Sequence, residues 1–525
     1  MALKEVQRTS GSVRPPSSAS RASHWWQVDP AGLIVGALLA ALSMTPSLLP
    51  RTWLFQGVVA GLTAFLGYGL GVFLLWWVRH TRWGRRLGKW LRDRLPSWVP
   101  RAAWAALLVG VLVLLVVALV AGARWQRDIS RLMGLDETPA ASWLLAGPLL
   151  LAVAALLLAV ARTLRWLSRQ VTRLLGRLHL PPGLARVVAA ALVAVVTVTL
   201  LNDVLLSKSL TTADSAFASG NDITKAGVEQ PASATRSGSP DSQVSWDSLG
   251  REGRSFVAVG RSADELGRVN GAQAKDPIRL FAGLETAREE QGRVDVVLAE
   301  MERTGAFTRR VVTVATTTTT TGSGWVDEKA IDSLELMHNG DTATVATQYS
   351  YLPSWLSFIV DSARVQKSGR LLFDAVHARL ERMPEAERPL LLVFGESLGS
   401  RGSEAAFSSL EDLRAQVDGA LWVGPPHSNR LWNALVERRD PGTPEVAPVY
   451  AGGLVVRFAG DRAQIDRPHG APWDRPRVLY LQHPSDPIVW WSPELLLRRP
   501  DWLVEPPGDD VSPSMSWYPW SPSGR

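Results

Sequence analysis

Residues 390–402 read LLLVFGESLGSRG, and this stretch decides the fold of the second half of the chain. An all-apolar run at 390–394 leads into GESLG at 395–399, which fits the pattern G-x-S-x-G, and residues 401–413 have a helical composition. Strand, sharp turn and helix in this order are the context in which the pattern exposes a serine above a sheet. We therefore predict that Ser397 is a nucleophile.

Two backbone N–H groups are expected to stabilise the oxyanion that attack by such a serine creates. The N–H of Leu398 is the natural first donor, because the start of a helix carries a partial positive charge. The second donor should come from a loop after an earlier strand, and TGSGW at 321–325 is the best candidate. Gly322 is predicted to be that donor because glycine permits close backbone approach, with an ordinary turn as the alternative.

The region around this motif, residues 246–525, alternates β-type apolar runs with amphipathic helical patterns. That alternation is typical of a mostly parallel sheet covered by helices, so an α/β domain is predicted. Residues 207–245 are rich in Ser, Ala, Thr, Gly and Pro and are predicted to be a flexible linker. The expected strands are SFVAVG, PIRLFAG, RRVVTVAT, TATVATQYS, PLLLVFG, GALWVG, LVVRFAG and RVLYLQH.

A catalytic serine needs a base, and the acid that orients this base is predicted to be Asp486. Asp486 follows the strand pattern VLYLQH and comes after the serine in sequence. This position agrees with the chain order Ser…Asp…His that accompanies the G-x-S-x-G motif. The alternative is a turn cap, because Ser-Asp-Pro favours turns.

No histidine follows Asp486, because the last of the eight histidines is His483. His483 ends its strand pattern close to the predicted site, and His427 follows the strand pattern GALWVG, so either is a candidate base. A hydrogen-bonded structural histidine is the alternative for both. The chain has no cysteine, which excludes disulfides, thiolate metal sites and cysteine nucleophiles. Neither a metal nor an organic cofactor is implied.

The first half of the chain, residues 31–206, is predicted to be a membrane domain in contact with the lipid bilayer, preceded by a disordered leader at 1–30. Five apolar runs are each long enough to cross a bilayer core about 30 Å thick. The first run contains Pro46 and Pro50, and a cleaved signal peptide is the alternative for it. The runs lie near 31–50, 54–78, 102–122, 141–161 and 184–206.

Positive charges between the runs predict the orientation of the helices, because Lys and Arg are retained on the cytoplasmic side. The leader and the second and fourth loops hold 18 Lys and Arg residues, against 4 in the first and third loops. The N-terminus is therefore expected in the cytoplasm, and the C-terminal domain outside it, at the inner membrane of the cell. The net charge of +7 comes mainly from these loops, so nucleic acid is not an expected partner.

Several long segments resemble a bacterial family of membrane-anchored α/β-hydrolases, from about residue 30 to residue 518. The resemblance implies a multi-helix membrane domain followed by a catalytic α/β-hydrolase domain. Members continue past the equivalent of SMSWYP into a further strand and a histidine-bearing loop, so a truncated or frameshifted C-terminus is expected here. The matching segments are SMTPSLLPR at 43–51, TGSGWVD at 321–327, QYSYLPSW at 348–355, GESLGSRG at 395–402 and LQHPSDPIVWWSPELLLRRPDW at 481–502.

The residues and the resemblance together predict a membrane-anchored serine hydrolase, similar to esterases, lipases or thioesterases, or an acyltransferase. Ser397 would attack an ester or thioester carbonyl outside the cytoplasm, and the membrane tether favours lipid or envelope esters. The alternative hypothesis is a catalytically silent hydrolase fold that serves as a binding or scaffold protein of the membrane. A transport module formed by the five helices is a third hypothesis.

Overall fold

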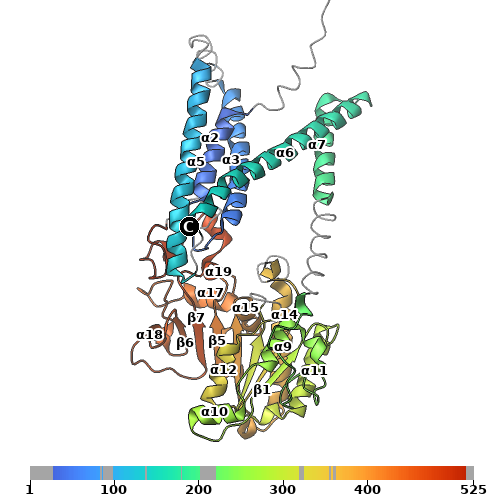
Figure 1. Cartoon of the computed structure of the whole chain (residues 1–525), viewed down its shortest axis with the longest axis vertical. Helices are drawn as coiled ribbons and strands as arrows, with labels where there is room; N and C mark the ends of the chain where they lie inside the picture. Colours follow the sequence, from blue (N-terminus) through green and yellow to red (C-terminus); the bar gives the residue numbers. More distant parts are fainter. Residues whose placement is uncertain are drawn as a thin grey trace, which may run out of the picture. The chain divides into compact units, whose positions relative to one another are not determined.

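The computed structural model describes residues 28–82, 86, 99–135, 139–178, 180–200, 220–318, 324–353, 356–358 and 362–515. The chain divides into two compact units, Met1–Pro46 with Pro50–Thr197 and Ser47–Leu49 with Val198–Arg525 (Figure 1). The first unit is helical and the second is built around one β-sheet, in the order predicted for a helical domain and an α/β domain.

Long apolar helices make up the first unit. Among the described residues, four segments are long and apolar enough to span a membrane, and they are Trp53–His80, Arg101–Leu132, Ala141–Arg177 and Pro182–Thr199. A further apolar helix, α2, is shorter. The helices of this unit that the structure describes are α2 Pro30–Ser43, α3 Trp53–His80, α5 Val99–Leu132, η1 Ala140–Leu145, α6 Ala146–Arg177 and α7 Pro182–Thr199.

The first predicted run, 31–50, is helical over only part of its length. Helix α2 ends at Ser43, and both Pro46 and Pro50 lie in the non-helical chain before α3. Proline lacks an N–H group and disfavours helical backbone at the residue before it, which explains the early end. The 14 residues of α2 rise by about 21 Å. Where the sequence predicted five spans, the described residues have four long apolar helices and one shorter apolar helix.

Glycines let α2 and α3 pack with their backbones in contact. A Cβ atom added to Gly36 would lie 2.8 Å from the carbonyl oxygen of Ala64, and one added to Gly71 would lie 2.3 Å from that of Ala31. The contacts run in opposite directions along the two helices, which therefore form an antiparallel hairpin. Close contacts between small residues stabilise helix pairs in a bilayer, where lipid tails are as apolar as leucine.

Seven parallel strands form the sheet of the second unit, in the order β1-β3-β2-β4-β5-β7-β6. The predicted parallel sheet is therefore confirmed, with β4 at its centre. All carboxyl ends of parallel strands meet at one edge, where loops from different strands converge. The strands are β1 Ile278–Ala282, β2 Val311–Thr316, β3 Thr342–Thr347, β4 Leu390–Glu396, β5 Gly419–Val423, β6 Val456–Ala459 and β7 Arg477–Leu481.

Helices pack on both faces of this sheet. Helices α11, α14 and α17 contribute to the larger apolar core on one face, whereas α9 and α12 contribute to a smaller core on the other. The helices of this unit are η3 Trp246–Leu249, α9 Gly250–Ala258, α10 Ala263–Asn270, α11 Glu290–Arg303, η4 Ala306–Thr308, α12 Glu328–Met337, α14 Ser362–Glu381, η5 Glu385–Glu387, α15 Leu398–Glu404, α16 Leu410–Gln416, α17 Arg430–Glu437, η6 Ala451–Gly453, α18 Arg462–Ile465, α19 Pro487–Trp490, η7 Pro493–Leu496 and η8 Asp501–Leu503.

Seven of the eight predicted strands are present, but SFVAVG is not a strand. Its first residues belong to α9, whose Phe256 and Val257 are buried. The ring of Phe256 packs against Phe281 of β1, with the centroids 6.2 Å apart. A short apolar run fits a buried helix face as well as a strand, which is why the sequence pattern misled the assignment.

Residues 220–245, predicted as part of a flexible linker, are packed in the second unit. Ser237 is fully buried, and its N–H donates to the carbonyl of Arg279 in β1 at 3.1 Å. The side chain of Arg236 donates to the carbonyls of Val257 and Val259. These hydrogen bonds order a polar segment that has little apolar surface to bury. The rest of the predicted linker, 207–219, and most of the predicted leader lie outside the described residues.

Candidate active site

Ser397 lies in the turn between β4 and α15 and has a strained backbone. Its φ is 51° and its ψ is −121°, a combination that residues other than glycine rarely adopt. The Ser397 N–H donates to the carbonyl of Val423 in β5 at 2.8 Å, which ties the turn to the neighbouring strand. Strain of this kind persists only where the surrounding structure maintains it, and it gathers at active sites. We call residues 395–399 the nucleophile elbow.

The two glycines of the nucleophile elbow are required by packing. A Cβ atom at Gly395 would lie 2.4 Å from the carbonyl oxygen of Gly399. One at Gly399 would lie 2.4 Å from the carbonyl oxygen of Thr316, the last residue of β2. Both contacts involve backbone atoms, which cannot move aside as a flexible side chain can. The glycines therefore allow α15 to begin directly against the central strands.

The start of α15 places the Leu398 N–H next to the serine. Leu398 is the first residue of the helix, and N–H groups of a first helical turn have no partner within their own helix. This group can therefore donate to an oxyanion that forms at Ser397. Gly322, the second predicted donor, lies outside the described residues. On either side of it, Thr318 and Trp325 are joined by two backbone hydrogen bonds of 2.9 Å.

Asp486 lies in the loop after β7. Its Oδ1 accepts the Ile488 N–H at 2.9 Å and caps α19. This oxygen therefore has the turn-cap role that was the alternative prediction for Asp486. A Cβ atom on Gly424, which follows β5, would lie 3.0 Å from Oδ2, so this second oxygen faces the neighbouring loop. Burial raises the pKa of the Asp486 carboxyl, while hydrogen bonds from Ile488 and Val489 and the charge of His483 lower it.

The sheet brings Ser397 and Asp486 to one edge. Strand β5 lies between β4 and β7, with Glu396 paired to Val423 and Val423 paired to Leu481. Neighbouring strands are about 4.8 Å apart, so the carboxyl ends of β4 and β7 are separated by about 10 Å. The predicted nucleophile and the predicted acid thus emerge two strands apart on the same edge.

The two candidate histidines have other contacts in the structure. The Nδ1 of His483 lies 3.8 Å from Oδ2 of Asp510, and the His483 side chain is 66% exposed. The His427 ring packs edge-on against Trp432, and burial lowers the pKa of its imidazole. Within the described part of the chain, no hydrogen bond joins either imidazole to Ser397. The serine and the acid are therefore not linked by a histidine in this conformation.

Glu396 is a titratable residue that sequence analysis missed. Burial raises the pKa of its carboxyl to about 7, and the charges of Asp327 and Asp486 add to the shift because like charges disfavour ionisation. Its position was a usable signal, because it is the residue directly before the serine at the end of a central strand. The edge that holds Ser397 therefore carries a group that changes charge near neutral pH.

A second missed residue, Glu404, is buried at the end of α15. Its Oε1 accepts the backbone N–H groups of Leu431 and Trp432, at 2.6 and 3.3 Å. Its Oε2 accepts the Tyr480 hydroxyl at 3.1 Å and the side-chain amide of Asn429 at 3.3 Å. Burial raises the pKa of Glu404 to about 7, although these hydrogen bonds act in the opposite direction.

This buried carboxyl is connected to the nucleophile elbow by hydrogen bonds. The amide of Asn429 also donates to Ser400 Oγ at 3.3 Å, and the Ser400 hydroxyl donates to the carbonyl oxygen of Ser397 at 2.6 Å. Both ends of α15 are therefore held, one by Glu404 and one by Ser400. A single acid beside the apolar residues 405–407 was the sequence signal for a buried carboxyl.

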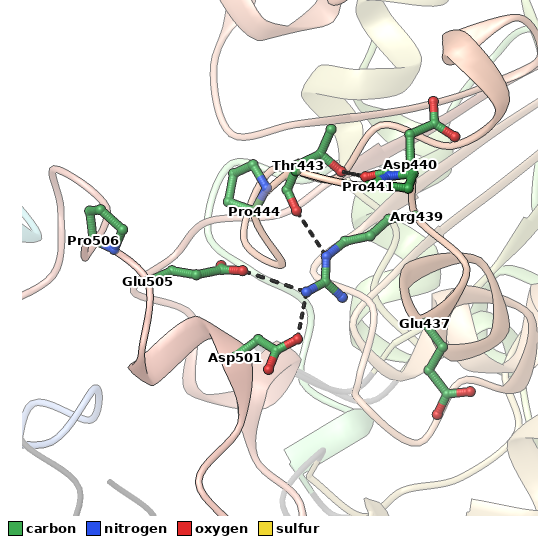
Figure 2. Close-up of a pocket in the computed structure, with 10 residues that line it drawn as sticks. Glu437, Arg439, Asp440, Pro441, Thr443, Pro444, Asp501, Glu505 and Pro506 are labelled. Carbon is green, nitrogen blue, oxygen red and sulfur yellow. Dashed lines mark hydrogen bonds and ion pairs between the residues drawn. The ribbon is translucent and has the colours of Figure 1, made fainter.

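A separate cavity of about 670 Å³ is lined by residues between 437 and 444 and between 501 and 506 (Figure 2). Arg439 projects into it, donates to Asp501 at 2.6 Å and lies 3.5 Å from Glu505. The Nε of Arg439 donates to the carbonyl of Thr443 at 3.0 Å. The arginine is thus engaged in internal ion pairs, and none of the predicted site residues that the structure describes lines this cavity.

Two family models match the chain. A model of the alpha/beta-hydrolase family matches residues 278–522, and a model of the N-terminus of an alpha/beta-hydrolase family matches residues 44–260. No curated protein and no solved structure matches it. The first model spans all seven strands, the nucleophile elbow and Asp486, and the second spans most of the helical unit. With the parallel sheet and the strained serine turn, these matches show that the chain belongs to the α/β-hydrolase family.

Proposed function

We propose that this protein is a membrane-anchored serine hydrolase that acts on an ester or thioester, or an acyltransferase that passes the acyl group to a second acceptor. The observation that carries the proposal is the strained backbone of Ser397 between β4 and α15. A positive φ at a serine costs on the order of 1–3 kcal/mol. A turn of this kind holds the serine Oγ above the sheet edge, where a carbonyl substrate can approach.

In the proposed reaction, Ser397 Oγ attacks the carbonyl carbon while an imidazole takes its proton. The Leu398 N–H donates to the oxyanion of the tetrahedral intermediate. When this intermediate collapses, the imidazolium returns the proton to the leaving alcohol or thiol, and an acyl-serine remains. Water then releases the acid in a hydrolase, and a second alcohol accepts the acyl group in an acyltransferase. Asp486 orients the imidazole and stabilises its cation.

We assign the role of base to His483. His483 lies two residues after the end of β7. The carboxyl end of β7 is about 10 Å from the carboxyl end of β4, which leads to Ser397. The side chain of His483 is 66% exposed, and exposed side chains change rotamer within nanoseconds, so rotation toward Ser397 displaces little packing. The charge of His483 already lowers the pKa of Asp486, which supports an acid–base pair of these two residues.

Labelling with a fluorophosphonate probe tests the proposal on the purified full chain in lipid nanodiscs. The wild-type protein is expected to react, and Ser397→Ala is expected to remain unlabelled. Ser333→Ala removes an exposed serine of α12 and is the matched control, which should react like the wild type. Labelling that survives in Ser397→Ala would contradict the proposal.

A second candidate function is a binding or scaffold protein that retains the hydrolase fold without catalysis. It is favoured by the position of the His483 imidazole, which lies against Asp510. Without a base, a serine keeps only the rate that binding and the oxyanion hole supply. A wild-type protein that neither reacts with the probe nor hydrolyses a p-nitrophenyl ester would establish this function in place of the first.

We also propose that the hydrolase domain lies outside the cytoplasm and that the helical unit spans the inner membrane. Four helices in the described part of the chain have the length and composition to cross, and the close pairing of α2 with α3 supports insertion of α2 as a fifth crossing. An odd number of crossings puts the two ends of the chain on opposite sides. The excess of Lys and Arg in alternate loops supports a cytoplasmic N-terminus.

The absence of cysteine makes this topology directly testable by single-cysteine labelling. Ser333→Cys should react with a membrane-impermeant maleimide in intact spheroplasts. Ser17→Cys, in the leader, should react only after the membrane is permeabilised. The reverse pattern would place the hydrolase domain in the cytoplasm.

A further inference from the structure

Helix α6 is longer than a membrane crossing requires (Figure 1). The apolar segment that contains it, Ala141–Arg177, has 37 residues, whereas about 20 helical residues cross a bilayer core. Residues 138–161 carry no charged side chain, so they are long enough to cross without the rest of the helix. The remaining part, 162–177, continues the helix by about 24 Å. We call residues 162–177 the basic half of α6.

Four arginines lie on one side of the basic half. Arg165, Arg169, Arg173 and Arg177 follow one another at intervals of four residues, which places them within an arc of about 120° around the helix. All four side chains are exposed. We call them the arginine stripe. Apolar side chains occupy the opposite side of the helix, and they are Leu164, Leu167, Val171, Leu174 and Leu175.

The arginine stripe has no counter-charge in the described part of the chain. None of its four side chains forms an ion pair with a described residue, and Arg173 donates to the side-chain oxygen of Gln170 at 3.0 Å. No acidic residue occurs between positions 138 and 202. Like charges four residues apart destabilise a helix. An anion bound along the stripe would therefore relieve the repulsion between the arginines.

The short connection to α7 keeps the basic half close to the membrane. Helix α7 is itself a candidate span, so in the proposed placement its first residue, Pro182, lies at a membrane surface. Five peptide units join Arg177 to Pro182, and fully extended they reach about 18 Å. This reach is shorter than the projection of about 24 Å that a basic half leaving the bilayer straight would have. The basic half is therefore expected to run along the headgroup layer.

The chain segments predicted on this side of the membrane do not supply the missing negative charge. The leader 1–30 and the loop 79–101 hold 12 Lys and Arg residues against three acidic residues, Glu5, Asp29 and Asp93. The Asp29 carboxylate already caps α2. These segments therefore repel the arginine stripe. The surface of a bilayer with anionic lipids has the opposite charge and attracts basic segments next to a membrane crossing.

We propose that the basic half of α6 binds anionic phospholipids, with the arginine stripe in contact with their phosphate groups. The proposal rests on the proposed membrane span of the helical unit and does not depend on catalysis. Guanidinium groups bind phosphate oxygens through paired N–H donors. The leucines opposite the stripe enter the acyl-chain layer, as in helices that lie in the membrane interface. Trp166 is 51% exposed on the side of the stripe, and indole prefers the headgroup region.

Quenching by nitroxide-labelled lipids tests the proposal on the full chain in nanodiscs of phosphatidylglycerol and phosphatidylcholine. A bimane fluorophore is attached to Gly176→Cys, because the chain has no other cysteine and a Cβ atom at Gly176 meets nothing within 4 Å. Only one of the two lipids carries the nitroxide in each sample, and the lipid composition is constant. Labelled phosphatidylglycerol should quench at least about fivefold more strongly than labelled phosphatidylcholine, the enrichment expected from one charge contact at an anionic surface.

Substitutions in the stripe separate the effect of charge from that of structure. Arg169→Gln/Arg173→Gln/Arg177→Gln should remove the preference for phosphatidylglycerol, because glutamine keeps helix propensity and loses the charge. Lysine at the same three positions should retain the preference, because it keeps the positive charge. An equal loss of preference in the glutamine and lysine variants would overturn the proposal, since charge would then not be its cause.

A matched control changes the net charge by the same amount elsewhere. Arg382→Gln/Arg414→Gln/Arg438→Gln alters three exposed arginines of the second unit and should keep the wild-type preference. Equal quenching by the two lipids with the arginine stripe intact would overturn the proposal while leaving the membrane span in place. No quenching by either lipid would overturn the proposal together with the membrane span on which it rests.

Competition at constant ionic strength distinguishes lipid from other anions. Glycerol phosphate in solution should leave the preference unchanged, and loss of the preference would assign the stripe to a soluble phosphate compound. Loss of the preference with polyglutamate would assign the stripe to an acidic protein. Either loss would overturn the assignment to lipid. Ser397→Ala should leave the preference unchanged, so the outcome of this test is separate from that of the proposed catalysis.

Discussion

The nucleophile elbow and the loop after β7 lie on the same edge of the sheet, but they are held in different ways. The elbow is fixed by backbone contacts with β2 and a backbone hydrogen bond to β5. The loop after β7 carries His483, whose side chain is two-thirds exposed, and a helix of only four residues, α19. The backbone therefore fixes the position of Ser397. The position of the candidate base, the His483 imidazole, depends on the rotamer of an exposed side chain.

This difference separates two properties of a hydrolase fold. The strained turn at Ser397 shows that the fold can expose a serine above the sheet. This geometry does not depend on a hydrogen bond between the serine and a histidine. In the proposed function, reactivity would depend on the second region, where the exposed imidazole of His483 would have to leave Asp510 to act on the serine. Substitutions in the elbow are therefore expected to have larger effects than substitutions in the loop.

Gly399→Val should have the largest effect, because the new side chain would begin 2.4 Å from a backbone oxygen of β2. We expect loss of probe labelling and a decrease of about 3 kcal/mol or more in the free energy of unfolding. Tryptophan fluorescence during thermal unfolding and fluorophosphonate labelling measure the two effects. Gly220→Val is the control, because a Cβ atom there meets nothing within 4 Å. Wild-type labelling of Gly399→Val would show that the elbow is less constrained than the structure indicates.

Changes in the loop after β7 should act on rate and leave the fold intact. His483→Gln should slow labelling by about 100-fold, the usual range for loss of a general base. Asp510→Asn should accelerate labelling or leave it unchanged, because Asp510 lies against His483 in the structure. His427→Gln is the control, since its ring packs against Trp432. Equal rates for His483→Gln and the wild type would remove His483 from the mechanism.

Glu404 should make stability depend on pH. Its folded-state pKa of about 7 exceeds the unfolded value of 4.5, so the folded protein holds a proton over this interval that the unfolded chain has released. The stabilisation is fully present below pH 4.5 and is lost as pH rises through 7, by about 3 kcal/mol at most. Glu404→Gln should reduce this dependence in thermal unfolding at pH 5 and pH 8, and the part that remains is expected from Glu396, whose pKa is also about 7. An unchanged pH dependence in the variant would assign it to another group.

The elbow and the sheet could be predicted from sequence because their signals are local. Each of the seven strands and the G-x-S-x-G motif is recognisable from a few consecutive residues. The two glycines of the motif are required because the tight turn brings their Cα atoms against backbone oxygens. The pattern failed at 255–260, where a short apolar run belongs to a helix. It failed again at 220–245, where hydrogen bonds to β1 order a segment of linker-like composition.

The rest of the site could not be predicted because it depends on residues far apart in the chain. The contact of His483 with Asp510 requires the chain after α19 to return to the end of β7. The shifted pKa of Glu404 requires α15, α17 and β7 to enclose it. Sequence spacing indicates which residue types are present, but the dielectric surroundings of a carboxyl are a property of the assembled fold.

The glycine contacts between α2 and α3 have a consequence for biogenesis. A helix of 14 residues is too short to be retained by itself as a bilayer-spanning segment. Its backbone fits against the longer α3 with no side chains between them at Gly36 and Gly71. If the helical unit spans a membrane as proposed, the two helices would insert as one pair, with the longer helix anchoring the shorter.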